Sequence, residues 1–298
     1  MIINGVAIED TFAEAFGMKA TRLVITADTA EWAWNAGNSM TGFATSVIAC
    51  GCEASIERRL LPEETPDGRP GVSVMIFSMS TKDLQKQVGD RVGQCVLTAA
   101  GSACFSGMDG GDPLKLGALL RYFGDGFQIA KKFGDRRYWR IPVMDGEFVC
   151  EHTVGTAKGI GGGNFLILAA SRAAALAATE KAVTAIRTVP NVILPFPGGM
   201  VRSGSKIGAK YKGLIASTNN AYCPTLKGQT ETALPPEVES VLEVVIDGLT
   251  AEDIAAAMRA GITAACELGA ANGVLRITAG NYGGKLGKFL FHLRELMA

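Results

Sequence analysis

Histidine and closely spaced cysteines are scarce in this sequence. The chain has only two histidines, and among its seven cysteines Cys50 and Cys52 form a lone C-x-C pair. A zinc site usually needs about four ligands in two close pairs, so we expect no bound metal. The odd number of scattered cysteines also argues against a disulfide framework and favours reduced thiols in a reducing compartment.

Long apolar runs and a surplus of one charge are also missing. No run approaches the roughly 18 to 20 residues that span a bilayer, and the acidic start lacks the form of a signal peptide. Lysine plus arginine and aspartate plus glutamate number 29 each, so the chain has no general basic field for nucleic acid. We therefore expect a cytoplasmic protein that binds neither a membrane nor nucleic acid.

Apolar residues are plentiful, and the two halves of the chain have predicted strands and helices in the same order. Apolar residues make up 48% of the 298 residues, enough for one large domain or two modest ones. In the first half, strand-like runs lie at residues 22–27, 46–49, 72–79 and 96–98. Helix-start signals lie at Thr29 and Ser80. In the second half, strand-like runs lie at residues 164–170, 191–196, 240–249 and 274–280. Helical stretches lie at residues 171–186 and 251–268.

This repeated β-α-β-β-α-β order predicts an α+β fold formed by tandem duplication of a ferredoxin-like lobe with antiparallel sheets. Residues 72–84 align with residues 242–254 without a gap, which supports the repeat. Residues 116–147 have the pattern of inserted hairpins, so we place the boundary near Gly146, with lobes over residues 1–146 and 147–298. The alternative is that any α/β chain of this length gives two loose matches of this kind.

Eight segments, spread over nearly the whole chain, carry a family resemblance. In order they are INGVAIEDTFAEAF at residues 3–16, TGFATSVI at 41–48, PEETPDGRPGV at 62–72, GQCVLTA at 93–99, GGNF at 162–165, PFPGG at 195–199, SGSK at 203–206 and AGNYGGKLGK at 279–288. Through these segments the chain resembles the formylmethanofuran–tetrahydromethanopterin formyltransferase family.

The resemblance implies a cytoplasmic enzyme of one-carbon metabolism. Such an enzyme moves a formyl group between the amine of a methanofuran-type carrier and N5 of a tetrahydromethanopterin-type pterin. The resemblance further implies two ferredoxin-like lobes, a homodimer or homotetramer, and no tightly bound cofactor, because the two carriers act as substrates. In methylotrophic bacteria the family supplies one subunit of a formyltransferase/hydrolase complex, so such subunits are candidate partners. The methanogen members are strongly acidic, whereas this neutral chain suggests a mesophilic host.

Glu243 is the candidate catalytic acid. Formyl transfer between two nitrogens needs a proton donor and stabilisation of an oxyanion, and a neutral carboxylic acid supplies both. Glu243 interrupts the apolar run VLEVVI, and side chains alternate along a strand, so it projects from the face opposite Leu242 and Val244. The matching residue of the first half is Ser73, so one repeat alone carries the carboxyl group. The resemblance places the family's catalytic glutamate at this position; the alternative is a solvated or ion-paired strand glutamate.

Substrate-binding candidates lie in glycine-rich loops. The loop at residues 195–213 combines glycines, serines and bases that suit anionic carrier tails, while STNNAY at 217–222 suits a pterin edge. With the GQC and AGNYGGKLGK segments, the candidates are Gln94, Gly198, Ser203, Ser205, Lys206, Lys210, Thr218, Asn219, Asn281 and Lys285. The alternatives are an ordinary solvated loop and, for Gln94, a helix-cap partner.

Two glycine-rich segments do not match the nucleotide-binding patterns that they resemble. AGNYGGKLGK has Ala279 in place of the first glycine of a phosphate-binding loop, and Leu286 in place of its serine or threonine. GIGGGN at residues 159–164 precedes a strand instead of following one, so it is not a dinucleotide fingerprint. A rival hypothesis from another class is a non-catalytic ligand-binding or assembly subunit of a one-carbon enzyme complex, because fold alone does not fix activity. The single carboxyl group at Glu243 argues against it.

Overall fold

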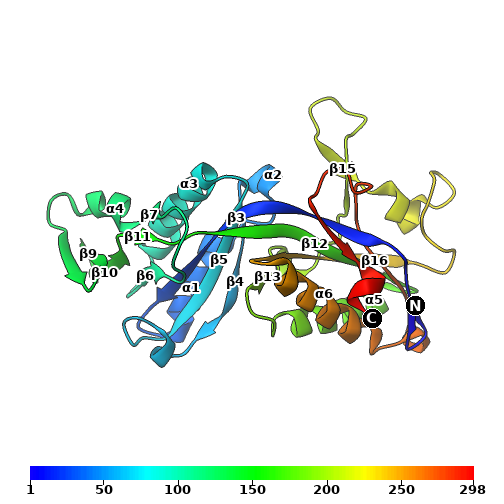
Figure 1. Cartoon of the computed structure of the whole chain (residues 1–298), viewed down its shortest axis with the longest axis horizontal. Helices are drawn as coiled ribbons and strands as arrows, with labels where there is room; N and C mark the ends of the chain where they lie inside the picture. Colours follow the sequence, from blue (N-terminus) through cyan, green and yellow to red (C-terminus); the bar gives the residue numbers. More distant parts are fainter. The chain divides into compact units, whose positions relative to one another are not determined.

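The structure is a computed structural model that describes residues 1–298, and it divides into two compact units of mixed α/β architecture. Unit 1 comprises Met1–Phe16, Gly162–Ile246 and Ala251–Ala298, and unit 2 comprises Gly17–Gly161 and Asp247–Thr250. Three strands contribute residues to both units: β3 (Phe12–Thr26), β12 (Ala157–Ala169) and β16 (Ser240–Gly248) (Figure 1). No helix of the chain combines the length and the apolar character that crossing a membrane requires.

A four-stranded antiparallel sheet forms the centre of unit 2. Its strand order is β4 (Glu53–Leu60), β5 (Gly71–Ser78), β3 and β6 (Ala103–Ser106). Helices α1 (Ala30–Thr41) and α3 (Thr81–Arg91) share a buried apolar cluster with these strands, to which Met40 and Leu84 contribute fully buried side chains. Burying each such side chain stabilises the fold by about 1.5 to 3 kcal/mol.

Both long helices of unit 2 begin at the residues that the sequence indicates. Thr29 Oγ1 accepts a hydrogen bond from the Trp32 amide at 3.2 Å, and Ser80 Oγ accepts one from the Asp83 amide at 3.1 Å. These side-chain acceptors satisfy amides that have no partner within the first helical turn. The strand expected over residues 72–79 is also confirmed, as β5.

The strand expected over residues 46–49 is wrong, because these residues lie in the short helix α2 (Val47–Cys50). Ser46 caps this helix, with Oγ accepting from the Ile48 amide at 3.4 Å, and Gly51 ends it in the left-handed region at φ 75°. The second strand of unit 2 is β4, whose sequence EASIERRL is too highly charged to have a clear apolar alternation.

The strand expected over residues 96–98 is also wrong. Helix α3 continues into a π-helical turn, Val92–Val96, in which the Leu97 amide donates to the Val92 carbonyl at 2.9 Å. Because the helical backbone continues through this π-helical turn, the fourth strand of unit 2 begins later in the sequence, as β6.

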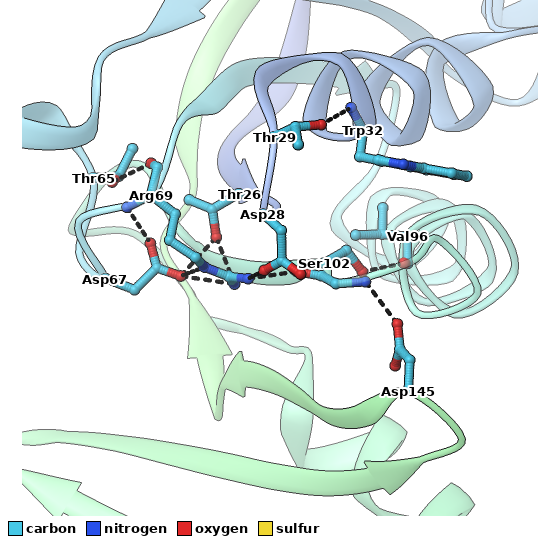
Figure 2. Close-up of polar contacts among 11 residues, drawn as sticks. Thr26, Asp28, Thr29, Trp32, Thr65, Asp67, Arg69, Val96, Ser102 and Asp145 are labelled. Carbon is cyan, nitrogen blue, oxygen red and sulfur yellow. Dashed lines mark hydrogen bonds and ion pairs between the residues drawn. The ribbon is translucent and has the colours of Figure 1, made fainter.

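The segment PEETPDGRPGV forms the loop that leads into β5, and the side chain of Arg69 holds this loop in place through hydrogen bonds (Figure 2). The Arg69 guanidinium donates to Asp28 Oδ1 at 2.8 Å, Asp67 Oδ2 at 2.9 Å and Thr26 Oγ1 at 3.2 Å. Thr26 Oγ1 in turn donates to Asp67 Oδ2 at 2.7 Å. This network fastens residues 62–71 to the end of β3, so the structure gives the segment an architectural role.

The expected hairpins occupy the remainder of unit 2. Strands β8 (Ile129–Phe133), β9 (Arg136–Val143) and β10 (Gly146–Glu151) pair in antiparallel order, and β10 joins β6 in parallel. The short helix α4 (Gly117–Leu120) precedes them, and β7 (Leu114–Lys115) pairs with β11 (Thr153–Val154).

In unit 1 the sheet has the order β17 (Val274–Thr278), β12, β16 and β13 (Val192–Ile193). Strand β2 (Val6–Ile8) extends it beside β17, and β1 (Ile2–Ile3) pairs with β2. Strand β18 (Phe289–His292) pairs with the start of β3 and leads into helix α7 (Leu293–Leu296). A separate hairpin consists of β14 (Ser205–Ile207) and β15 (Ala216–Thr218).

Helices α5 (Arg172–Ile186) and α6 (Ala251–Cys266) pack closely together in unit 1 (Figure 1). Small residues permit this approach: a Cβ atom on Gly261 would lie 2.7 Å from Ile186 Cδ1. The expected helix start at Ser171 is confirmed, because its side chain accepts from the Ala174 amide at 3.1 Å.

Candidate functional site

Strand β16 positions Glu243 in unit 1. Val244 and Ile246 are fully buried, whereas Glu243 is half-buried, which agrees with the alternation expected along the strand. An isolated antiparallel bridge holds the backbone of Glu243 against Val201. The Glu243 amide donates to the Val201 carbonyl at 2.9 Å, and the Val201 amide donates to the Glu243 carbonyl at 2.7 Å. The acid therefore lies at the start of the glycine-rich loop.

Burial raises the pKa of Glu243 to about 7, well above its ordinary value. The physical cause is desolvation, which disfavours the charged form of a carboxyl group. At neutral pH a substantial share of molecules carries Glu243 as a neutral acid, able to donate a proton or a hydrogen bond. This is the protonation state that a departing amine or a developing oxyanion requires.

Tyr282 lies in the electrostatic neighbourhood of Glu243. Burial raises the pKa of the Tyr282 phenol, and the nearby carboxylates of Glu243 and Glu14 raise it further. The ring of Tyr282 also contacts that of Phe16, with centroids 6.0 Å apart and planes tilted by 52°. The turn that carries Tyr282 therefore belongs to the surroundings of the acid.

Glu14, on the unit 1 end of β3, is enclosed by this turn. Its side chain is 1% exposed, and both carboxylate oxygens accept hydrogen bonds from backbone amides of the turn. Oε2 accepts from Tyr282 at 2.7 Å and from Gly284 at 2.9 Å, and Oε1 accepts from Leu286 and Gly287 at 2.6 Å each. Burial alone would raise the pKa of Glu14, but the four amide donors outweigh it and lower the pKa to about 2. Glu14 is thus an anion at neutral pH.

The β14–β15 hairpin brings several of the expected substrate-binding residues together. Ser205 lies opposite Thr218, and Lys206 lies opposite Ser217 and contacts the side-chain oxygen of Asn220. Five expected members are exposed on this hairpin and the loop around it: Ser203, Ser205, Lys206, Lys210 and Thr218. The start of the same loop is bridged to Glu243, so one continuous segment links these side chains with the acid.

Two further expected members lie near the hairpin. One is partly buried, and the other is notable for its backbone conformation. Asn219 is half-buried, and its carbonyl accepts from the Cys223 thiol at 3.3 Å. Gly198 adopts φ 67°, which favours glycine, in a turn within the first part of the glycine-rich loop.

The remaining expected residues lie elsewhere. The Asn281 side chain donates to the Phe12 carbonyl at 3.1 Å and accepts from the Gly283 amide at 3.1 Å, so it braces the turn around Glu14. Lys285 is exposed on that turn. Gln94 is exposed on the π-helical turn of unit 2, where its carbonyl accepts from Thr98 Oγ1 at 2.7 Å. Substrate contact by each of these residues stays a prediction.

Two acidic features escape prediction from the sequence. Glu14 is one, although it interrupts an apolar strand in the same manner as Glu243, and that interruption is the signal that identifies both. The second is a carboxyl pair in unit 2, where Glu53 hydrogen-bonds with the fully buried Asp247. Burial raises the pKa of Glu53 despite this bond. Elsewhere, no three histidine, cysteine or acidic side chains gather in a manner suited to a metal ion.

Comparison with known families gives two matches that together span nearly the whole chain. Residues 1–143 match the family described as formylmethanofuran-tetrahydromethanopterin formyltransferase. Residues 146–296 match the model described as FTR, proximal lobe.

Curated relatives match over all or nearly all of their length. The formylmethanofuran–tetrahydromethanopterin formyltransferase of Methylococcus capsulatus is 68% identical over 298 residues, covering 100% of each chain. A subunit of the formyltransferase/hydrolase complex of Methylorubrum extorquens is 55% identical, covering 99% of this chain and 97% of the relative.

Solved structures agree with the sequence matches. The formyltransferase/hydrolase complex of Methylorubrum extorquens, in complex with methylofuran, contains a chain that matches with a TM-score of 0.97 and 54% identity, covering 100% of this chain and 99% of that one. The formyltransferase of Methanosarcina barkeri matches with a TM-score of 0.94 and 49% identity, covering 99% and 100%.

The shared fold and the shared length of these matches define a transferase that acts on formyl groups. More specifically, the chain belongs to the formylmethanofuran–tetrahydromethanopterin formyltransferase family, as its resemblance predicts.

Proposed function

We propose that this chain transfers a formyl group between the amine of methanofuran, or an analogue, and N5 of tetrahydromethanopterin, or an analogue, with Glu243 as the catalytic acid. The observation that carries the proposal is a half-buried strand carboxyl group whose pKa is raised to about 7. A carboxyl group with this pKa has access to both protonation states at neutral pH. Membership of the family supports the reaction, and the raised pKa of Glu243 supports its role as the acid.

In the mechanism, the acceptor amine attacks the formyl carbon and the carbonyl oxygen becomes an oxyanion. Neutral Glu243 donates a hydrogen bond to this oxygen and then gives its proton to the departing nitrogen as the carbon–nitrogen bond breaks. The proton lost by the attacking amine restores the acid, so no net proton is consumed. The cycle runs in either direction, because each carrier presents a nitrogen to the same formyl carbon.

The β14–β15 hairpin is the proposed holder of the carriers' anionic tails. Its exposed Lys206 and Lys210 supply positive charge, and Ser203 and Ser205 supply hydroxyl donors. Thr218 and Asn219 offer polar groups for a pterin edge. Gln94, Gly198, Asn281 and Lys285 complete the proposed substrate-binding set. Both carriers act as substrates, and no tightly bound cofactor is part of the proposal.

We further infer that the chain is a tandem duplication of ferredoxin-like lobes. The chain order β3, α1, β4, β5, α3, β6 in unit 2 is β-α-β-β-α-β, with the sheet order β4, β5, β3, β6. The order β12, α5, β13, β16, α6, β17 repeats this pattern in the sheet of unit 1, whose order is β13, β16, β12, β17. A boundary near Gly146, with lobes over residues 1–146 and 147–298, remains part of this proposal.

For assembly, we infer a cytoplasmic homodimer or homotetramer that also associates with subunits of a formyltransferase/hydrolase complex. The support is the relative in Methylorubrum extorquens, which is named as a subunit of such a complex. All seven cysteines are free thiols, which suits a reducing compartment. Sedimentation velocity of the purified chain measures this state, and a fully active monomer would contradict the homo-oligomer.

The function is tested by mixing the purified chain with formylated tetrahydromethanopterin and methanofuran, and following the pterin absorbance as the formyl group leaves N5. We expect transfer by the chain alone, at an unchanged rate after incubation with a metal chelator. A chain that binds either carrier but transfers nothing would favour the non-catalytic subunit. Activity that disappears on chelation and returns with zinc would overturn the metal-free mechanism.

A further inference from the structure

The turn at residues 281–287 is shaped around a single buried anion. Four of its backbone amides converge on the Glu14 carboxylate, two on each oxygen, at 2.6 to 2.9 Å. Gly283 and Gly284 adopt φ 75° and 70°, backbone conformations that favour glycine and curve the turn around the carboxylate. Such converging amides form an anion-binding concavity, and here its ligand is a side chain of the same unit.

Glu14 is fixed as tightly as the turn. It lies on β3 opposite Leu290 of β18, the strand that follows the turn. A Cβ atom on Gly287 would lie 2.7 Å from Glu14 Cγ and 2.5 Å from the Ala15 carbonyl oxygen. The chain therefore passes against the side chain with no room for a larger residue. With four donors and 1% exposure, Glu14 is engaged within the protein and is not a substrate ligand.

The same strand controls the side chain of Tyr282. Glu14 and Phe16 are two residues apart on β3, so their side chains project from one face. Glu14 binds the Tyr282 amide, and the Phe16 ring contacts the Tyr282 ring at a centroid distance of 6.0 Å. The backbone and the ring of Tyr282 are thus both held from β3. The turn is also tied to the strand beside Glu243. Gly280, two residues before Tyr282, exchanges hydrogen bonds with the Asn164 side chain of β12 at 2.6 and 3.1 Å. Strand β12 pairs with β16, which carries Glu243, and the charge of Glu243 raises the pKa of the Tyr282 phenol.

We propose that Glu14 is a positioning residue for formyl transfer: by filling the amide concavity of residues 281–287 it holds the Tyr282 ring beside Glu243, where the ring limits access of water to the acid. The proposal rests on the proposed function of Glu243. Its consequence is that a change at Glu14, which touches no substrate, alters the protonation of Glu243 through Tyr282.

The test compares pH–rate profiles of the wild type, Glu14→Gln, Tyr282→Ala and the double variant, with Glu9→Gln as the control. Glu14→Gln keeps the shape of the side chain but turns an NH2 group toward two amide donors, so the turn loses part of its anchor. Glu9 lies in the same N-terminal segment, but its carboxylate binds Arg276 at 2.7 Å, whereas the amides of the turn bind Glu14. Tyr282 is 38% exposed, so Tyr282→Ala tests the same link without opening the core.

In the wild type, we expect kcat to fall as the pH rises through about 7, because Glu243 is active as the neutral acid. Glu14→Gln should move this limb to lower pH, since water returns to Glu243, and should lower kcat by about 10- to 100-fold. Tyr282→Ala should do the same, the double variant should lose no more than Tyr282→Ala alone, and Glu9→Gln should match the wild type.

The outcomes separate this inference from the function on which it rests. A limb that persists in Glu243→Gln would overturn the role of Glu243, and the inference with it. If the limb belongs to Glu243 but stays in place in Glu14→Gln, or in a folded Tyr282→Ala, the positioning role of Glu14 alone is wrong. Independent losses that multiply in the double variant would equally contradict transmission through Tyr282.

Discussion

Glu14 and Glu243 each interrupt an apolar strand of unit 1, yet their pKa values shift in opposite directions. Burial raises the pKa of Glu243 to about 7, whereas burial with four amide donors lowers that of Glu14 to about 2. The amide donors decide the sign, because each hydrogen bond to the carboxylate favours the charged form. One carboxyl group is thereby suited to proton transfer and the other to holding a turn.

The depressed pKa of Glu14 predicts a contribution to stability that depends on pH. The stabilisation is fully present above the ordinary carboxyl pKa of 4.5 and is lost as the pH falls toward about 2. We therefore expect the difference in unfolding free energy between wild type and Glu14→Gln to shrink between about pH 5 and about pH 3. Urea unfolding followed by circular dichroism at each pH measures it. A difference that stays constant over this range would contradict the bound carboxylate.

At the scale of elements, sequence patterns succeed where local chemistry decides the structure. Thr29, Ser80 and Ser171 each start a helix because their own side chains bind amides in the first turn. Strand β16 is equally predictable, because its buried face alternates with the face that carries Glu243.

Sequence patterns fail where distant residues decide the structure. Strand β4 is charged and depends on pairing with β5, and residues 96–98 continue from a π-helical turn that no residue pattern announces. The same limit applies to the site. Glu243 stands out within its own strand, whereas the amides that bind Glu14 come from residues 268 to 273 positions later.

The β14–β15 hairpin carries the prediction at this scale. Replacing Lys206 and Lys210 together by alanine should raise KM for a carrier with its anionic tail by about 3- to 10-fold, because exposed charges are partly screened. A tail-less analogue should be little affected, and kcat should be unchanged for both. Steady-state kinetics with the two carriers measures this.

Lys131 and Lys132 provide a matched control, because they form another exposed lysine pair, on β8 of unit 2. Their double replacement by alanine removes the same charge and should leave both KM values unaltered. Equal increases for the tailed and the tail-less carrier in the Lys206 and Lys210 variant would reject the hairpin as a tail-binding element.

For the whole molecule, the proposed duplication places different residues at one equivalent strand position of the two repeats. At the position that aligns with Glu243, unit 2 has Ser73, which is buried and donates to Glu57 Oε2 at 2.7 Å. Arg22 donates to both oxygens of Glu57 at 2.8 Å each, so this carboxylate is held in a bidentate ion pair. The equivalent strand in unit 1 instead carries an acid whose pKa is raised by burial. Under the proposed function, one repeat provides the proton donor, whereas the aligned position of the other repeat supports an ion pair.

In the proposed mechanism, formyl transfer depends most directly on the proton of Glu243, and the kcat of Glu243→Gln tests this dependence. Glutamine preserves size and a hydrogen-bond donor but transfers no proton. General acid catalysis contributes about 10²- to 10⁴-fold, or about 3 to 5 kcal/mol of barrier. The folded variant should therefore bind both carriers with nearly unchanged affinity, lose kcat by about that factor, and lose the wild-type decline in rate above a pH of about 7. Turnover within a few-fold of wild type at saturating carriers would contradict proton transfer from Glu243.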